Sequence, residues 1–231
     1  MQLDETIETQ PFRWFASDTL MTRSRRQLFS IYLFGMGLLI GLPYLLINHF
    51  IPMLWVSDVQ VEIALDSSIP FIPSSLVPYL SLYLYYPIFA YLLAKEQHRS
   101  EGIEMMRYFL IMTWISFAFF MAFPTEIHLR PEPRPERFER LYQVLYSIDQ
   151  PFNAWPSLHV AQSLFILLAS VHLKSNENEM MWYTKLVLIV FWICLVLSTL
   201  TTKQHYVFDA VSGALLGWGT WKFYQRNSRA S

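Results

Sequence analysis

Two histidines and the residues around them are the groups in this sequence best suited to chemistry. His205 and Asp209 lie four residues apart, where one apolar run ends and the next begins. Residues at this spacing share a face of a helix, so Asp209 can accept the proton of one imidazole nitrogen and leave a lone pair on the other. Such a histidine can be a base, a metal ligand or a nucleophile. The alternative is a structural hydrogen bond at an interface.

The second histidine belongs to the segment Pro156-Ser157-Leu158-His159. Pro156 suits the first turn of a helix, where its missing N–H is not needed. The N-terminus of that helix favours an anion, and Ser157 adds a hydroxyl donor. His159 lies in the same turn and can protonate a leaving oxygen. A capping serine and a solvated histidine would be the ordinary interpretation of the same segment.

Two cations outside this segment could bind a phosphate group. Arg130 offers two parallel donors, whereas Lys203 offers a compact charge two residues before His205. The other arginines in the loop of Arg130 alternate with glutamates, which favours a solvated or headgroup-facing surface. These residues are Arg134, Arg137 and Arg140, with Glu132, Glu136 and Glu139.

Together these groups could transfer a phosphoryl group without a metal or any other cofactor. A helix N-terminus, a hydroxyl group and cations would hold the phosphate, while one histidine attacks phosphorus and the other protonates the leaving group. Water or an alcohol would then resolve the phosphohistidine. A metalloenzyme that uses His159, His205 and Asp209 as a set of two histidines and one carboxylate is an alternative.

The composition places this chemistry in a membrane. Hydrophobic residues make up 54% of the 231 residues and charged residues only 15%, whereas a soluble domain has about 25% charged residues. A helix of about 20 residues spans the hydrocarbon, and six apolar runs approach that length. We therefore predict an all-α, six-span transmembrane helical bundle, with spans at 28–48, 74–94, 107–123, 157–173, 184–201 and 206–224.

The domain boundaries follow from these spans. Residues 1–27 form a cytoplasmic or interfacial N-terminal segment, residues 28–224 form the six-helix membrane domain, and residues 225–231 form a cytoplasmic tail. The expected partners are a lipid phosphate and the bilayer, and a homodimer is a possible assembly. The net charge of −1 provides no bulk field for nucleic acid.

The positions of lysine and arginine predict the orientation. With both termini in the cytoplasm, 12 of the 17 basic residues lie on the inner side, as the positive-inside rule requires. The loop 124–159, the start of the fourth span and the segment around Lys203 then all face outward. Three polar segments that meet at one membrane face indicate a site. Short loops and the absence of a cleavable signal fit a bacterial inner membrane, with the site facing the periplasm.

These residues resemble the type 2 phosphatidic acid phosphatase superfamily, which comprises membrane lipid phosphatases and phosphotransferases. Its second motif, Pro-Ser-x-His, is matched by Pro156, Ser157 and His159. The order of the motifs and the six-span layout agree as well, so the resemblance covers about two thirds of the chain, from the third span onward.

The other two motifs match in part. The third motif is Ser-Arg, five residues, His, three residues, Asp, and the first motif is Lys, six residues, Arg-Pro. Thr199 replaces the expected arginine and Phe123 replaces the expected lysine. The matching positions are Ser198, His205 and Asp209 for the third motif and Arg130-Pro131 for the first.

The segments "FPTEIHLRP" and "STLTTKQHYVFD" are similar to the branch that includes inositol phosphorylceramide and sphingomyelin synthases. The resemblance implies His205 as nucleophile with Asp209 as the residue that orients it, and His159 as general acid. It implies Ser157 and Arg130 as phosphate ligands. Ser198, which matches the third motif, is also assigned to the phosphate site. Position alone adds Thr199 and Lys203, with Lys203 as a substitute for the missing arginine.

The expected function is therefore that of an integral membrane lipid phosphatase, which dephosphorylates a lipid phosphate or diphosphate at the outer face. A phosphotransferase that moves a phospho-headgroup between lipids shares the first half-reaction and differs only in the acceptor. A transporter or scaffold is a third interpretation, but the polar groups cluster at one end rather than near the midplane.

Two further features bear on the packing. "GALLG", from Gly213 to Gly217, allows close approach of helices. In the first outer loop, Asp58, Glu62 and Asp66 have a spacing of four, which we interpret as the solvated face of a short helix.

Overall fold

A computed structural model describes residues 20–55, 59, 61–95, 97, 99–131, 138–177 and 181–228. Across these residues the regular secondary structure is helical, and one isolated bridge pairs Thr125 with Asn153. The helical elements follow in chain order: α2 (Arg25–Met36), η1 (Gly37–Gly41), α3 (Leu42–Leu54), α4 (Ala64–Ser68), η2 (Pro73–Ser75), α5 (Leu76–Leu80), α6 (Leu82–Leu93), α7 (Arg99–Ala122), α8 (Glu139–Ile148), α9 (Leu158–Glu177), α10 (Trp182–Thr201) and α11 (Val207–Ser228).

Among the residues that the structure describes, four helical segments are long and apolar enough to cross a membrane. They are Arg25–Leu54, Pro73–Leu93, Arg99–Ala122 and Trp182–Thr201. The apolar part of α9, Leu158–Leu173, is shorter, and α11 is not among the four. The all-helical class is thus confirmed, whereas the number of spans and the side of the membrane on which the termini lie stay predictions.

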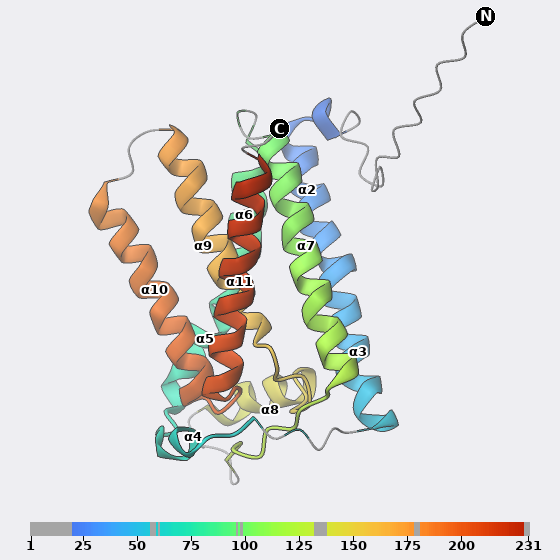
Figure 1. Ribbon diagram of the computed structural model, residues 1–231, viewed down its shortest axis with the longest axis vertical. Coiled ribbons are helices and arrows are strands. Elements are labelled where there is room, and N and C mark those ends of the chain that lie inside the picture. Colours follow the sequence, from blue (N-terminus) through green and yellow to red (C-terminus); the bar gives the residue numbers. More distant parts are fainter. Residues whose placement is uncertain are drawn as a thin grey trace, which may run out of the picture.

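The long helices lie alongside one another in a bundle (Figure 1). The start of α2 and the end of α11 lie at one end of the bundle, whereas α4 and α8 lie at the opposite end, where α10 ends and α11 begins (Figure 1). The first predicted span, 28–48, is longer in the structure, because α2, η1 and α3 continue without a break from Arg25 to Leu54.

Helix α9 is the central element, because it packs against α6, α7, α10 and α11. Its Phe165 is fully buried and contacts the rings of Phe89, Phe109 and Trp221, at centroid distances of 6.3, 5.8 and 5.8 Å. Large buried aromatic side chains contribute much of the burial energy of such a core. This packing fixes α9 relative to three neighbouring helices.

The contact between α9 and α11 is especially close. A Cβ atom added at Gly217 would lie 2.6 Å from the carbonyl oxygen of Ala161, and one added at Gly213 would be closer still to the carbonyl oxygen of Ser157. Real Cβ atoms essentially never approach within 3.0 Å. Only glycine fits these two positions, so the "GALLG" segment brings the N-termini of α9 and α11 together.

Candidate active site

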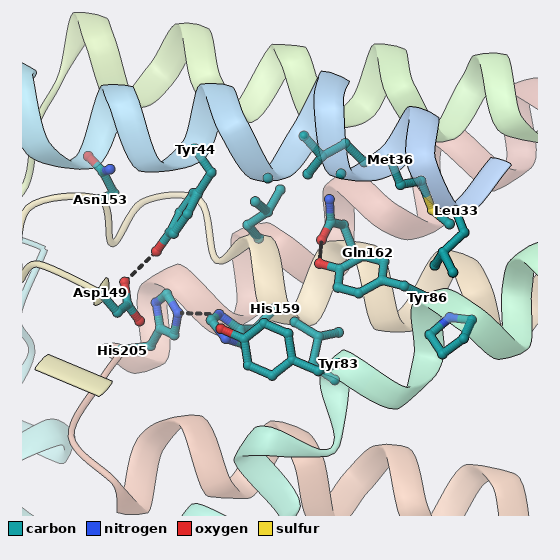
Figure 2. A pocket seen from close by; sticks show the side chains of 16 residues that line it. Leu33, Met36, Tyr44, Tyr83, Tyr86, Asp149, Asn153, His159, Gln162 and His205 are labelled. Atoms are coloured by element: carbon teal, nitrogen blue, oxygen red, sulfur yellow. Dashed lines mark hydrogen bonds between the residues drawn. The ribbon is translucent and has the colours of Figure 1, made fainter. Parts of the chain in front are cut away.

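The two histidines of the motifs meet at the end of the bundle that holds α8. His159 lies in the first turn of α9, and His205 lies in the segment between α10 and α11. The Nε2 atom of His205 is 3.4 Å from the Nδ1 atom of His159, and the ring centroids are 5.4 Å apart. Figure 2 shows the two rings meeting at their edges, through these nitrogen atoms. The convergence of these segments agrees with the sequence prediction.

A backbone carbonyl sets the tautomer of His205. Its Nδ1 atom lies 3.1 Å from the carbonyl oxygen of Ala154. A carbonyl oxygen only accepts hydrogen bonds, so Nδ1 bears the hydrogen and Nε2 presents its lone pair to His159. The Oδ2 atom of Asp209 is 3.6 Å from the same Nδ1 atom, beyond the range of a good hydrogen bond. Ala154 thus makes the bond that the sequence assigned to Asp209.

Asp209 acts on His205 through its charge and through the backbone. It is fully buried in the first turn of α11, and its Oδ2 atom accepts a hydrogen bond of 2.9 Å from the backbone N–H of Tyr206. His205 precedes the helix, which begins at Val207. The expected shared helical face is therefore wrong, and the two side chains are close because residues 202–206 fold back over the end of α11.

Asp66 holds this segment in place. Its Oδ1 atom accepts a hydrogen bond of 2.7 Å from the N–H of Val207, and its backbone carbonyl accepts one of 2.7 Å from Nζ of Lys203. Only 2% of Asp66 is exposed. The interpretation of Asp66 as part of a solvated face is wrong, because α4 folds beneath the site rather than into solvent. Asp58, in the same predicted face, lies outside the described residues.

Lys203 is directed to Asp66 rather than to a phosphate. It has a φ angle of 55°, in the left-handed region that non-glycine residues rarely adopt. Burial lowers the pKa of its ammonium group, an effect that Asp66 and Glu62 partly offset. The side chain stabilises the turn before His205, and it does not line the cavity beside the histidines.

Ser157 is the N-cap of α9. Its Oγ atom accepts a hydrogen bond of 3.4 Å from the N–H of Val160, and its own N–H donates to the carbonyl oxygen of Asp209 at 3.0 Å. Pro156 lies before the helix rather than in its first turn, and the peptide bond between Trp155 and Pro156 is cis. The cap and the Asp209 contact join the two helix ends at which the histidines lie.

The other predicted phosphate ligands have protein partners in this conformation. The hydroxyl groups of Ser198 and Thr199 donate to carbonyl oxygens of α10, at 2.6 and 2.7 Å. The Nη1 atom of Arg130 donates to the carbonyl oxygen of Asp149 at 2.7 Å, and its guanidinium lies 4.8 Å from the ring centroid of Tyr146. Arg130 therefore lies near the site, but none of the three lines the cavity.

A cavity of about 310 Å³ opens beside the histidine pair, between the α2–η1–α3 segment, α6 and α9. Its wall is mostly apolar, and Figure 2 shows Asp149, the hydroxyl of Tyr44 and His159 near His205, with Gln162 and Tyr86 further along the cavity. Tyr86 donates to Oε1 of Gln162 at 2.5 Å, and Gln162 donates to Thr113 at 2.8 Å, so these polar groups are paired. The lining residues are Leu33, Met36, Gly37, Ile40, Gly41, Tyr44, Leu82, Tyr83, Tyr86, Pro87, Asp149, Asn153, Leu158, His159, Gln162 and His205.

Asp149 is the residue of this cavity that the sequence prediction missed. Its carboxylate accepts hydrogen bonds from the phenols of Tyr44 and Tyr79, the latter at 2.8 Å. The ring of Tyr79 in turn stacks on His159, with centroids 4.5 Å apart. The one sequence signal was the place of Asp149 in the polar segment before Pro156.

The charge on Asp149 persists in this setting. Burial by itself would raise the pKa of the carboxyl group. Nearby positive charge, chiefly that of Arg130, and the hydrogen bonds from Tyr44 and Tyr79 outweigh burial and hold that pKa below its ordinary value. The cavity therefore contains a carboxylate next to the histidine pair.

Within the described ranges, no three side chains of His, Cys, Asp or Glu cluster in a way that could hold a metal ion. At the site, the imidazole of His205 presents a nitrogen lone pair to the imidazole of His159, and the buried carboxylate of Asp209 lies 3.6 Å from the other nitrogen of His205. These are the groups that phosphoryl transfer through a histidine requires.

One comparison with known proteins identifies the family. The sequence model of the PAP2 superfamily matches residues 71–223, which include Arg130, His159, His205 and Asp209. Neither the curated proteins nor the solved structures gave a significant match. With more than half of its length matched and both motif histidines in contact, this chain belongs to the PAP2 superfamily of phosphatases and phosphotransferases.

Proposed function

We propose that this protein is an integral membrane enzyme that cleaves the phosphate ester bond of a lipid phosphate or diphosphate through a phosphohistidine at His205. The observation that supports this most strongly is the contact between His205 and His159 at the polar end of an apolar cavity. One histidine presents a lone pair, the other a proton, and the cavity between helices is open to an apolar substrate.

In the first step, the lone pair on Nε2 of His205 attacks phosphorus, and the ester P–O bond breaks. His159, whose Nδ1 atom faces His205, gives its proton to the leaving oxygen. The substrate phosphate must displace the 3.4 Å contact between the two rings, because that distance leaves no room for phosphorus. Having given up this proton, His159 can accept one in the second step.

The phosphohistidine has a positive imidazole ring, and two groups stabilise it. The hydrogen on Nδ1 remains bonded to the carbonyl oxygen of Ala154, and the buried carboxylate of Asp209 lies 3.6 Å away. A fixed negative charge in a water-excluded site stabilises developing positive charge strongly. Asp209 is therefore an electrostatic partner of His205 more than a hydrogen-bond partner.

In the second step, water attacks phosphorus from the side opposite His205. His159 takes a proton from that water, the N–P bond breaks, and the lone pair returns to Nε2. Phosphate leaves, and both histidines regain their starting states. The net reaction consumes one lipid phosphate and one water molecule.

The membrane setting supports a lipid substrate. The cavity lies between helices whose outer faces are apolar, and large hydrophobic side chains such as Leu38, Leu42 and Leu84 are exposed on them. We further propose six spans with both termini in the cytoplasm, so that the histidines face the outer side of a bacterial inner membrane. The even number of crossings fits the position of both ends of the described chain at the end of the bundle away from the site (Figure 1).

A second candidate, transfer of the phospho-headgroup to another lipid, is favoured by one observation. The cavity lining includes the carboxylate of Asp149 but no lysine or arginine among the described residues. Phe123 and Thr199 occupy two positions at which the superfamily motifs have cations. A site that has a carboxylate and lacks these two cations holds a dianionic phosphomonoester less strongly than a site with the complete motifs.

The test is turnover by the purified protein in detergent micelles that contain labelled phosphatidic acid, with and without an added alcohol. Release of inorganic phosphate supports the phosphatase, and formation of an alkyl phosphate at the expense of free phosphate supports transfer. His205→Asn should abolish both products. Undiminished turnover by His205→Asn would refute the proposed role of this histidine.

A further inference from the structure

The carboxylate of Asp149 has no place in the two steps described for the proposed function. It lies in the same cavity as His159 and His205, and its two hydrogen-bond partners are the neutral phenols of Tyr44 and Tyr79 (Figure 2). Arg130 binds the backbone carbonyl of Asp149 at 2.7 Å and lies over the ring of Tyr146. Among the described residues, the donors to this carboxylate are the two phenols, and the charge of Arg130 acts on it without a bond to its oxygens. A carboxylate in this position next to the proposed phosphate site requires an explanation.

Three features give this carboxylate access to a substrate. It lies on the cavity wall rather than in the packed core, and its side chain is half-buried rather than enclosed. Each of its oxygens accepts one hydrogen bond from a tyrosine. An ionised carboxylate has about four lone-pair sites, so each oxygen can accept a further bond from a ligand.

The chemistry of a carboxylate restricts what it can bind. It accepts hydrogen bonds and donates none, so the group that faces it must be a donor, such as a hydroxyl or an ammonium group. It also repels a second negative charge. A phosphomonoester has a charge of roughly −1.5 to −2 near neutral pH, whereas a phosphodiester has one negative charge and bears a second substituent.

We propose that Asp149, held by Tyr44 and Tyr79, is a specificity-determining residue that binds a hydroxyl or ammonium group on the substrate headgroup. The preferred substrate is then a phosphodiester lipid with a donor on its headgroup, rather than a bare phosphomonoester. This inference rests on the proposed function, because it assumes that a phosphate group occupies the space between the two histidines.

A structural role for Asp149 is the alternative, because its hydrogen bonds join α3 and α5 to the segment before α9. A second cross-link of the same segment provides a control. Asn48 in α3 donates to the carbonyl oxygen of Ile148 at 2.8 Å and accepts from Asn153 at 3.0 Å. Asn48 does not line the cavity. Asn48→Ala therefore loosens the segment without a change at the carboxylate.

The experiment compares lipids with identical acyl chains in detergent micelles, with release of diacylglycerol as the readout. Phosphatidic acid is the monoester, and phosphatidylmethanol is a diester with no donor. Phosphatidylglycerol and phosphatidylethanolamine are diesters with hydroxyl and ammonium donors. For each protein, the measured quantity is kcat/KM with each donor-bearing lipid divided by kcat/KM with phosphatidylmethanol.

We expect the wild-type ratio to be about ten or more for at least one donor-bearing lipid, since one hydrogen bond to a charged group contributes about that factor. The comparison of the two donor-bearing lipids distinguishes a hydroxyl from an ammonium ligand. Asp149→Asn should bring the ratio close to one and raise relative activity on phosphatidic acid. Asn48→Ala should lower thermal stability and leave the ratio unchanged.

Three results would overturn the inference. A wild-type ratio near one does so without any variant, and it leaves the proposed function intact as long as the lipids are turned over. If Asp149→Asn lowers kcat/KM equally for every lipid and leaves the ratio unchanged, Asp149 has a structural role alone. No turnover of any of the four lipids by the wild type overturns the proposed function and this inference together.

Discussion

Gly213 in α11 lies against the backbone carbonyl of Ser157 in α9 so closely that no side chain fits between them. Ser157 immediately precedes α9, and the His205 segment immediately precedes α11, so this contact determines how far apart the two histidines lie. The 3.4 Å contact between their nitrogen atoms is thus a consequence of helix packing as much as of local sequence.

Gly213→Ala should therefore separate His205 from His159. The added methyl group must displace the backbone of Ser157, and overpacking of this kind costs about 1–3 kcal/mol. We expect at least a tenfold loss of kcat on phosphatidic acid, with a lower midpoint of thermal unfolding. Gly219→Ala in the same helix is the matched control, because nothing lies within 4 Å of its added Cβ atom. Equal activity of the two variants would contradict this account.

Lys203→Met tests the role of the buried lysine. The ammonium group binds the carbonyl oxygen of Asp66 at 2.7 Å and stabilises the turn before His205. We expect lower thermal stability and lower kcat, at a KM for phosphatidic acid within about twofold of the wild type. A KM raised about tenfold or more, without loss of stability, would instead support the phosphate contact that the sequence predicted.

Gly41→Leu tests whether the cavity holds a hydrocarbon chain. Gly41 lines the cavity, and nothing lies within 4 Å of an added Cβ atom, so leucine should enter the cavity without a clash with the protein. We expect kcat/KM to fall about tenfold or more for a long-chain phosphatidic acid. A short-chain, water-soluble phosphatidic acid should be affected much less. Gly219→Leu is the control for a leucine in open space, and equal losses with both lipids would argue against a chain in the cavity.

The pKa of Asp149 predicts how its contribution to stability depends on pH. A folded-state pKa below the ordinary aspartate value stabilises the protein above that value, about 3.9. This stabilisation is lost as the pH falls through the lower folded-state pKa. The difference in unfolding midpoint between the wild type and Asp149→Asn, measured in detergent, should therefore shrink below about pH 4. A difference that grows with acidity would contradict the sign of the shift.

Apolar runs and the motif residues were sufficient to predict the long helices and the meeting of the two histidines, but not α8 in the loop before α9. Runs of apolar residues determine which segments are helical in lipid, because the backbone must satisfy its own hydrogen bonds there. The polar ends of those runs, at His159 and His205, were then the natural place for a site. The small residues Gly213 and Gly217 also indicated a close contact, although not which helix they would meet.

The neighbours of the site could not be predicted in this way, because they come from the paths of loops. Asp66 and Asp149 lie in segments whose polar residues usually face water, and only the fold directs one beneath α11 and the other into the cavity. The partners of Lys203 and the contact of Ala154 with His205 depend on backbone turns that no spacing reveals. The charge around the proposed phosphate site was thus the least predictable property.

The most direct test of the central claim is to trap the covalent intermediate. The protein is mixed with phosphatidic acid labelled on phosphorus, quenched in alkali and digested, and the acid-labile phosphate is located by mass spectrometry. His128→Asn, a change at an exposed loop histidine, is the matched control. We predict label on His205 in the wild type and in the control, and none in His205→Asn. Turnover of the lipid with no label on His205, or with label on another residue, would contradict the account.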